Sequence, residues 1–323
     1  MIFLGVLVCR ILMTTSSLSD RLRDPFLPVI HNPMIDLTDR TQLGAYLKDQ
    51  RLWLKKEASQ HFLVDREIVD AITRVANLKP TDTVLEIGPG VGTLTQALAE
   101  EVTDGLVLAV EYDQRLVNLL RENFKPFHQV KIVHSDFMRF DLSSIETDKA
   151  GYKVVSNLPY HLTGAILRQL TNPALEEHQP AQMVLMIQKE VADRLLAVPG
   201  TRSRGMPTIL TEVYGRVERV VDVPHSCFFP PPEVDSTVVN CVRRKRPLSI
   251  PEAQAIIRLA KAGFSAKRRT LANALAGSLR QTKDRVEGWL KIAAIPILAR
   301  AEDLDFASWQ KLVAIVGAEI TTS

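Results

Sequence analysis

Cysteine is scarce in this chain, and its scarcity argues against two kinds of protein. Only Cys9, Cys227 and Cys241 occur among 323 residues, and no two of them form a C-x-x-C pair. A disulfide framework needs paired cysteines, and a structural zinc site needs clustered cysteines and histidines. The composition therefore favours a protein of a reducing compartment, the cytoplasm, that uses no metal.

Long apolar runs are missing as well. The apolar stretch at residues 2–13 is interrupted by Arg10 and is too short to span a bilayer. No basic residue precedes it and no A-x-A site follows it, which argues against a signal peptide. The segment 14–50 is polar with scattered prolines. We expect residues 1–45 to form a poorly ordered extension, with Met34 as an alternative start, and we expect no membrane partner.

A strong net charge is also absent, but basic residues concentrate near the C-terminus. The formal charge is +3, from 40 basic and 37 acidic residues. From Cys241 to Arg280 the chain holds ten Lys or Arg and one acid, Glu252. A solvated helix face accounts for many such runs, and a surface that meets nucleic-acid phosphates is the alternative. The charge pattern alone leaves both open.

With 46% hydrophobic residues the chain can bury a sizeable core, and strands alternate with helices from Thr83 onward. Helical periods occur at residues 92–101 and 116–123. Apolar runs predict strands at residues 84–87, 106–110, 130–133, 153–156, 183–187 and 234–242. Strand–helix–strand repeats predict an α/β fold, with a doubly wound, Rossmann-like parallel sheet that binds ligands at the carboxyl ends of its strands.

The pattern changes after Pro247. Residues 250–318 contain helical periods rich in Ala and Leu and no convincing strand. We therefore predict a ligand-binding sheet domain over residues 46–246 and a smaller all-helical domain over residues 247–323.

A glycine turn joins the first predicted strand to a helix. Gly88, Gly90 and Gly92 stand at alternate positions, where missing side chains let a ligand approach the backbone. Dinucleotide folds use similar turns, but this one lacks the third glycine of G-x-G-x-x-G. Pro89 also removes a backbone donor that a pyrophosphate would use. A ligand without phosphates, such as S-adenosylmethionine, fits the turn better.

Acidic residues end the next two predicted strands. Glu111 follows the second strand and could accept hydrogen bonds from both hydroxyls of a ribose. Asp136 follows the third strand and could accept one from an adenine amine. The alternative is that both acids only cap the helices after them. Their alignment with the glycine turn along one sheet edge favours ligand binding.

The fourth predicted strand leads into Asn157-Leu158-Pro159-Tyr160. An adenine amine is a weak nucleophile, and two acceptors on its hydrogens would aim its lone pair at a methyl group. The Asn157 side-chain oxygen and the Leu158 carbonyl can be those acceptors. Pro159 stiffens the turn, and Tyr160 offers a face for an extruded base. A bare turn with a core tyrosine is the alternative, which the position after the fourth strand disfavours.

Five segments together resemble the ribosomal RNA adenine dimethylase family, over about residues 55–275. They are Ser59-Gln60-His61-Phe62-Leu63, the glycine turn Glu86–Gly92, Asn157–Tyr160, Phe228–Ser236 and the basic segment Phe264–Asn273. The resemblance departs from the family pattern at Ser59, where glycine is usual, and at His61, where asparagine is common.

The resemblance implies a site and a substrate. It implies donor contacts at His61, Leu63, Gly88, Glu111, Asp136 and Asn157, next to Gly90 of the turn. It makes Phe228 the second aromatic wall of the base pocket, opposite Tyr160; the alternative for Phe228 is a core residue in a rigid loop. Lys267, Arg268 and Arg269 would face RNA phosphates. The expected reaction is dimethylation of the N6 amines of two adjacent adenosines in the 3′-terminal hairpin of small-subunit rRNA.

The expected partner is small-subunit rRNA within an immature 30S-type particle, acted on by a monomer that contributes to ribosome biogenesis. Two rivals remain from the sequence. One is a resistance methylase for large-subunit rRNA, which the basic C-terminal segment and Asp235-Ser236 disfavour. The other is a binding protein that has kept the fold, either an assembly checkpoint or a transcription factor. The complete set of donor-binding residues argues against it.

Overall fold

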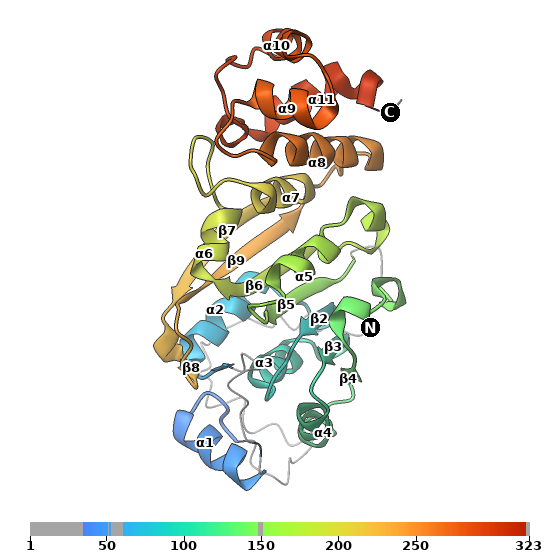
Figure 1. The fold of residues 1–323 in the computed structure, drawn as a ribbon. Coiled ribbons are helices and arrows are strands. Elements are labelled where there is room, and N and C mark those ends of the chain that lie inside the picture. The colour runs from blue at the N-terminus through green and yellow to red at the C-terminus, as the bar shows by residue number, and fades with distance from the viewer. Residues whose placement is uncertain (1–34, 51, 53–60, 148–150, 321–323) are drawn as a thin grey trace, which may run out of the picture. The chain divides into compact units, whose positions relative to one another are not determined.

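The computed structural model describes residues 35–50, 52, 61–147 and 151–320 (Figure 1). The contacts group the chain into two units, Met1–Met34 and Ile35–Ser323, and only the second contains described residues. The predicted extension therefore lies outside the described residues over positions 1–34. Helix α1 (Arg40–Asp49) begins within the last part of that predicted segment and buries Leu43 among apolar side chains, and the boundary at residue 45 stays a prediction.

A seven-stranded sheet runs through the second unit in the order β4-β3-β2-β5-β6-β9-β7 (Figure 1). The five parallel strands are β2 (Thr83–Ile87), β3 (Leu106–Glu111), β4 (Val130–His134), β5 (Lys153–Asn157) and β6 (Gln182–Gln188). The strand order reverses between β2 and β5, which is the switch point where open α/β sheets bind ligands. The predicted Rossmann-like α/β sheet is thus confirmed.

Two further strands make the sheet mixed rather than wholly parallel. β9 (Ser236–Arg243) pairs antiparallel with β6, and β7 (Gly215–Val223) pairs antiparallel with β9. The sequence predicted β9 but not β7. As an edge strand, β7 buries few of its residues and carries charged side chains, among them Arg219 and Asp222, so it has no apolar run.

Both faces of β2, β3, β5 and β6 are buried, which explains their continuous apolar runs, whereas the edge strand β4 has no buried residue. In β2, Leu85 and Ile87 face one core cluster while Val84 faces another. The helices of this region are α2 (Arg66–Ala76), α3 (Thr93–Glu101), α4 (Gln114–Asn123), α5 (Thr163–Leu170), α6 (Lys189–Leu195) and α7 (Met206–Tyr214). Helices α2 and α3 pack into the cluster of Val84, and α5 packs into the cluster of Leu85. The sheet is therefore covered from both sides.

The described chain after Arg243 is helical. It forms α8 (Ile250–Phe264), α9 (Leu271–Leu279), α10 (Lys283–Ile292) and α11 (Phe306–Ile320). Their common core also contains Ile209 and Val213 of α7. A domain of residues 247–323 would therefore lack part of its own core, and the boundary near Pro247 stays a prediction. None of the helices in the described ranges combines the length and hydrophobicity that crossing a bilayer requires.

We predict that α7 and helices α8–α11 depend on each other for stability. Ile209→Ala removes a fully buried side chain from their common core and should lower the free energy of unfolding by about 2–5 kcal/mol. Leu210→Ala, at the half-buried neighbouring position, is the control and should cost less. Denaturant unfolding measures both variants. Equal costs for the two, or unchanged amide exchange in α8–α11 of Ile209→Ala, would contradict the shared core.

Candidate active site

A cavity of about 790 Å³ lies at the carboxyl ends of β2, β3, β4 and β5. Its volume falls in the range of small-molecule sites. The short strand β1 (Phe62–Leu63), which pairs with β8 (Phe228–Phe229), also contributes to the lining. The cavity brings together ten residues that the sequence predicts for the site: His61, Leu63, Gly88, Gly90, Glu111, Asp136, Asn157, Leu158, Pro159 and Tyr160.

The glycine turn after β2 forms one wall of the cavity. Gly88 and Gly90 both have positive φ, at 69° and 63°, which a residue with a side chain rarely adopts. A Cβ atom on Gly90 would also lie 2.9 Å from the Phe62 ring. The Gly88 N–H donates to the Val110 carbonyl, which joins the turn to the end of β3. The turn therefore exposes bare backbone to the cavity for reasons of both conformation and space.

Glu111, the last residue of β3, is buried in the cavity wall with 8% of its surface exposed. One carboxylate oxygen accepts from the Gly90 N–H at 3.2 Å, and the other accepts from the Asp113 N–H at 2.8 Å. Burial raises the pKa of Glu111, and these backbone hydrogen bonds oppose that shift. Each oxygen keeps a second lone pair, so the carboxylate can still accept hydrogen bonds from a ligand's hydroxyls.

Asp136 and Leu63 line the cavity beside Glu111 while also serving the local structure. Asp136 accepts from the Met138 N–H and caps the short 3₁₀-helix Phe137–Arg139. Asp136 therefore caps the following helix, as the alternative held, and it also lines the cavity. Leu63 is buried, and its strand pairs with β8.

His61 is held in place by a backbone carbonyl. Its Nδ1 lies 2.8 Å from the Pro230 carbonyl oxygen, and because a carbonyl only accepts, Nδ1 carries the hydrogen. The His61 ring stacks with Tyr160 at a centroid distance of 6.2 Å. The Tyr160 hydroxyl in turn lies 2.7 Å from Ser236 Oγ, and burial raises the pKa of Tyr160. The two rings therefore form a fixed edge of the cavity.

Asn157 is the last residue of β5, and the two ends of its side-chain amide have different surroundings. Its Nδ2 donates to the His61 carbonyl at 3.4 Å, and this bond fixes which amide atom is the nitrogen and which is the oxygen, Oδ1. Oδ1 is buried and has no hydrogen-bond partner among the described residues. A buried acceptor without a donor is costly, so its presence in a cavity indicates a ligand donor.

Leu158 and Pro159 fix the chain after Asn157. The Leu158 N–H donates to the Met186 carbonyl of β6 at 3.0 Å, and its side chain is buried in the core. The Pro159 carbonyl accepts from the Leu162 N–H and from the Thr163 hydroxyl. These bonds tie the segment both to the neighbouring strand and to the start of α5.

Phe228 is placed differently from the expectation. Its side chain is fully buried in the core between the sheet and α2, and it does not line the cavity. The alternative, a core phenylalanine in a rigid loop, describes this position. The physical reason is the pairing of Phe228 with Leu63 in the β1–β8 ladder, which points both side chains inward. Tyr160 and His61 are two of the aromatic rings that line the cavity, and they contact each other.

Lys267, Arg268 and Arg269 lie away from the cavity lining, in the connection between α8 and α9. All three side chains are exposed. We call these three residues the basic turn. Its exposure suits contact with a polyanion, and its position separates that contact from the cavity.

The sequence analysis missed two buried polar groups in the cavity wall. Glu86, in β2, is 2% exposed and accepts a 2.6 Å hydrogen bond from the Thr95 hydroxyl; burial raises its pKa to about 8. The Thr93 hydroxyl, at the start of α3, is buried and lacks a partner within the described part of the chain. The only available signal was their position on either side of the glycine turn.

Tyr112 and Met138 were missed as well. Both line the cavity, and their side chains are 74% and 38% exposed, so they lie at its mouth. Tyr112 directly follows Glu111, and Met138 comes two residues after Asp136, so both could have been found from the strand-end acids. Exposed apolar side chains beside polar acids are suited to cover the flat face of a ligand.

The cavity lies at the strand ends beside a glycine turn that is unsuited to phosphates, and the sheet has an antiparallel β7–β9 edge. Together these features define a Rossmann-like methyltransferase that uses S-adenosylmethionine. Comparison with known families makes this specific. The family model for ribosomal RNA adenine dimethylases matches residues 52–316. The chain belongs to the ribosomal RNA adenine dimethylase family.

Curated relatives support the assignment. A protein named ribosomal RNA small subunit methyltransferase A from Dehalococcoides mccartyi is 40% identical over 279 residues, which cover 84% of this chain and 91% of the relative. The protein of the same name from Listeria monocytogenes is 36% identical over 281 residues, covering 84% and 93% of the two chains.

Solved structures agree on the fold. A dimethyladenosine transferase from Plasmodium falciparum aligns with a TM-score of 0.67 at 23% identity, over 80% of this chain and 98% of its own. The 23S rRNA methyltransferase ErmE aligns with a TM-score of 0.62 at 27% identity, over 79% and 99% of the two chains.

We predict that Glu86 makes the protein less stable as the pH rises. Its pKa is about 8 in the folded state against an ordinary value of 4.5, so between these values the folded state keeps a proton that the unfolded state releases. Stability should therefore fall with rising pH by about 1.4 kcal/mol per pH unit from this group. Glu86→Gln keeps an acceptor for Thr95 and should remove this slope.

Denaturant unfolding between about pH 5 and 8 measures the difference between the two proteins. Glu100→Gln, at an exposed position of the neighbouring helix α3, is the matched control and should follow the wild type. Parallel stability curves for wild type and Glu86→Gln would contradict the burial of a protonated Glu86.

Proposed function

We propose that this chain methylates the N6 amines of two adjacent adenosines in the 3′-terminal hairpin of small-subunit rRNA, with two methyl groups on each. The observation that carries the proposal is the buried Asn157 Oδ1 in the cavity, an acceptor that lacks a donor among the described residues. The names of the curated relatives support the small subunit as the target.

The cavity residues fit S-adenosylmethionine as the methyl donor. The bare turn at Gly88 and Gly90 leaves room for close backbone approach, and Glu111 keeps lone pairs for the ribose hydroxyls. Asp136 accepts from the adenine amine of the donor, with Leu63 and His61 on the β1 side of the cavity. When bound, this ligand supplies a methyl group on a sulfonium, whose carbon–sulfur bond breaks as the new nitrogen–carbon bond forms.

The Asn157–Tyr160 segment prepares the target amine. Asn157 Oδ1 accepts one amine hydrogen, and the Leu158 carbonyl accepts the other, which aims the nitrogen lone pair. Pro159 and the bond from Leu158 to Met186 hold these acceptors still, so the protein contributes positioning and fixed dipoles. The proton that the amine releases after transfer passes to water.

Tyr160 stacks on the extruded base. Its hydroxyl bond to Ser236 and its contact with His61 hold the ring at the edge of the cavity. Base extrusion is necessary because the N6 amine is inaccessible within a stacked helix. Phe228 would have to leave the core to form a second wall, so we assign the stacking role to Tyr160.

The basic turn, Lys267–Arg269, binds rRNA phosphates outside the cavity, and recognition rests mainly on RNA shape. We propose that the protein acts as a monomer on an immature 30S-type particle in the cytoplasm, and that its binding contributes to small-subunit biogenesis. The 23S rRNA methyltransferase ErmE shares the fold at 27% identity, so the large subunit is the competing target.

We predict that purified protein transfers labelled methyl groups to immature 30S particles and not to 50S particles. Asn157→Ala should lower this activity by at least about 100-fold, because the amine loses its acceptor. The variant should still bind the particles, since the basic turn is unchanged. Mass spectrometry of the rRNA identifies the modified bases.

The control for Asn157→Ala is Asn118→Ala, the same substitution at an exposed position of α4. It should methylate like the wild type. Labelling of 50S particles instead of 30S particles would refute the proposed target. Full activity of Asn157→Ala would refute the proposed role of its amide.

We predict that replacing Lys267, Arg268 and Arg269 with glutamine weakens binding to the particle and makes binding less sensitive to salt. The slope of log K against log salt concentration is negative. Its magnitude should decrease by roughly 0.7–0.9 for every phosphate that is no longer neutralised. Affinity for the methyl donor should not change, because the basic turn does not line the cavity. Binding titrations at several salt concentrations measure the slope.

The matched control carries the same change of charge at Arg121, Lys125 and Lys131, which are exposed around α4 and β4. Its salt slope should match that of the wild type. An unchanged slope in the Lys267, Arg268 and Arg269 variant would show that the basic turn does not meet phosphates.

A further inference from the structure

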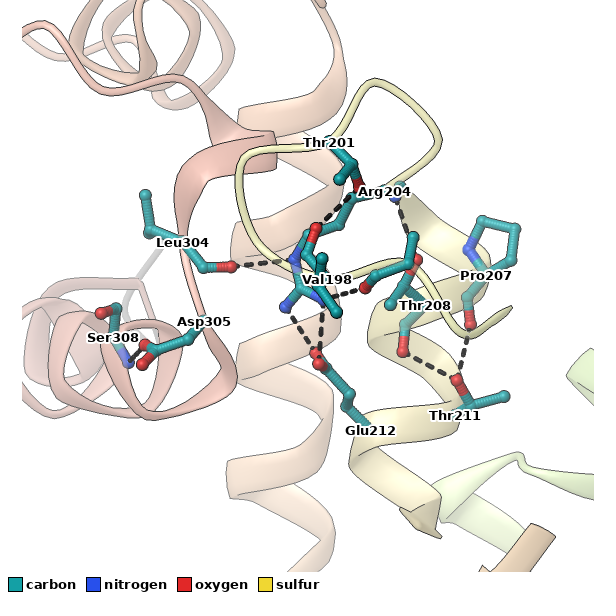
Figure 2. Close-up of polar contacts among 12 residues, drawn as sticks. Val198, Thr201, Arg204, Pro207, Thr208, Thr211, Glu212, Leu304, Asp305 and Ser308 are labelled. Carbon is teal, nitrogen blue, oxygen red and sulfur yellow. Dashed lines mark hydrogen bonds and ion pairs between the residues drawn. The ribbon is translucent and has the colours of Figure 1, made fainter. Parts of the chain in front are cut away.

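Arg204 is a fully buried arginine outside the active site, in the loop at residues 196–205 that joins α6 to α7 (Figure 2). Its Nε donates to the Leu304 carbonyl at 2.9 Å. Nη1 donates to the Ala197 carbonyl at 3.0 Å and to Glu212 Oε1 at 2.9 Å, and Nη2 donates to Glu212 Oε2 at 2.8 Å. The guanidinium therefore joins its own loop, α7 and a segment one hundred residues later.

The bidentate pair with Glu212 accounts for the charge but not for the whole arrangement. A guanidinium matches a carboxylate in a two-bond fork, and this pair neutralises the buried cation. A donor outside this pair, Nε, is aimed at a backbone carbonyl in the C-terminal helical region. An ion pair that served only local stability would not need that bond. The arrangement points to a connection between the two regions of the chain.

The segment that receives this bond is Ala299–Asp305, which we call the bridging segment. It is fixed at a second point to the same loop, because the Gly200 N–H donates to the Glu302 carbonyl at 2.9 Å. At its other end the Ala299 carbonyl accepts from the Leu271 N–H at 2.7 Å. Leu271 is the first residue of α9 and comes two residues after Arg269 of the basic turn.

The loop at residues 196–205 is in turn tied to the sheet. Helix α6 begins directly after β6, the strand whose Met186 carbonyl holds Leu158. The Thr208 hydroxyl of α7 donates to the Arg194 carbonyl of α6 at 2.6 Å, which joins the two helices on either side of the loop. Hydrogen bonds, joined by short stretches of main chain in β6, α6, α7 and the bridging segment, thus link the Asn157–Tyr160 segment to the basic turn.

We propose that Arg204 is a positioning residue that fixes the basic turn relative to the active-site cavity. The proposal rests on the proposed function, in which the basic turn holds rRNA while the cavity holds one of its bases. Two contacts on one rigid substrate require a fixed distance between them, and the bridging segment sets that distance. Removal of the Arg204–Leu304 bond should loosen the basic turn without changing the cavity.

The test compares Arg204→Met with the wild type in methylation of immature 30S particles by labelled S-adenosylmethionine. We expect the KM for particles to rise about tenfold or more, with the dissociation constant of the donor unchanged within twofold. Amide exchange at Leu271 and Gly200 should become faster, because their acceptors lie in the bridging segment. Arg204→Lys keeps a charge and some of the donors, so its KM for particles should lie between those of the wild type and Arg204→Met.

A second variant separates positioning from stability. Arg204→Met with Glu212→Met leaves no buried unpaired charge, so the melting temperature should recover, while the Leu304 carbonyl still lacks its donor. The KM for particles should therefore stay raised. Arg219→Met is the matched control: Arg219 pairs with Asp193 and Asp222 at the surface, away from the bridging segment, so its variant should keep the wild-type KM.

Three outcomes decide the inference. A wild-type KM in the double variant, or unchanged exchange at Leu271 in both variants, would make Arg204 a purely structural residue and overturn the proposal. A raised KM with faster exchange supports it. If the wild-type protein fails to methylate 30S particles, the proposed function fails separately, and exchange together with particle binding by the variants still decides the role of Arg204.

Discussion

The parallel pairing of β2, β3, β4 and β5 is the constraint on which the active site depends. It aligns Ile87 with Val110 and Glu111 with His134, so chain segments far apart in sequence end at one edge. Most polar groups of the cavity are attached to one of these ends or to the turn after it, and His61 comes from the segment beside β1. Strand order and register therefore place most of the site, and long-range side-chain bonds such as those of His61 to Pro230 and Tyr160 to Ser236 complete it.

The site also holds polar groups that burial makes costly. Glu86 is kept as a buried acid, and the Asn157 and Thr93 side chains present oxygens without partners among the described residues. Such groups lower stability, and a well-packed sheet with apolar cores on both faces can tolerate them. A low-dielectric pocket strengthens every hydrogen bond that a ligand makes there. The same buried groups that lower stability therefore favour a ligand that can pair with them over one that cannot.

The sequence predicts what local pattern determines. The parallel strands, the glycine turn and the strand-end acids each follow from a short run of residues, and the cavity gathers them as expected. Phe228 shows where this fails, because its neighbour Leu63 lies far away in sequence and their pairing alone decides which way the ring points. The bond from Arg204 to the Leu304 carbonyl could not be predicted for the same reason. Tertiary packing brings the two residues together, and no sequence pattern near Arg204 indicates Leu304 as its partner.

The shared core of α7 with helices α8–α11 has a consequence for how this family can vary. A core that crosses from residue 209 to residue 316 cannot be divided at the sequence position where the helical region begins. A chimera that takes α8–α11 from a relative would inherit mismatched partners for Ile209, Val213 and the Arg204 loop. Recombination between such enzymes should therefore succeed when the crossover falls before α6, at the end of β6, and the inherited piece carries its own loop and helix α7.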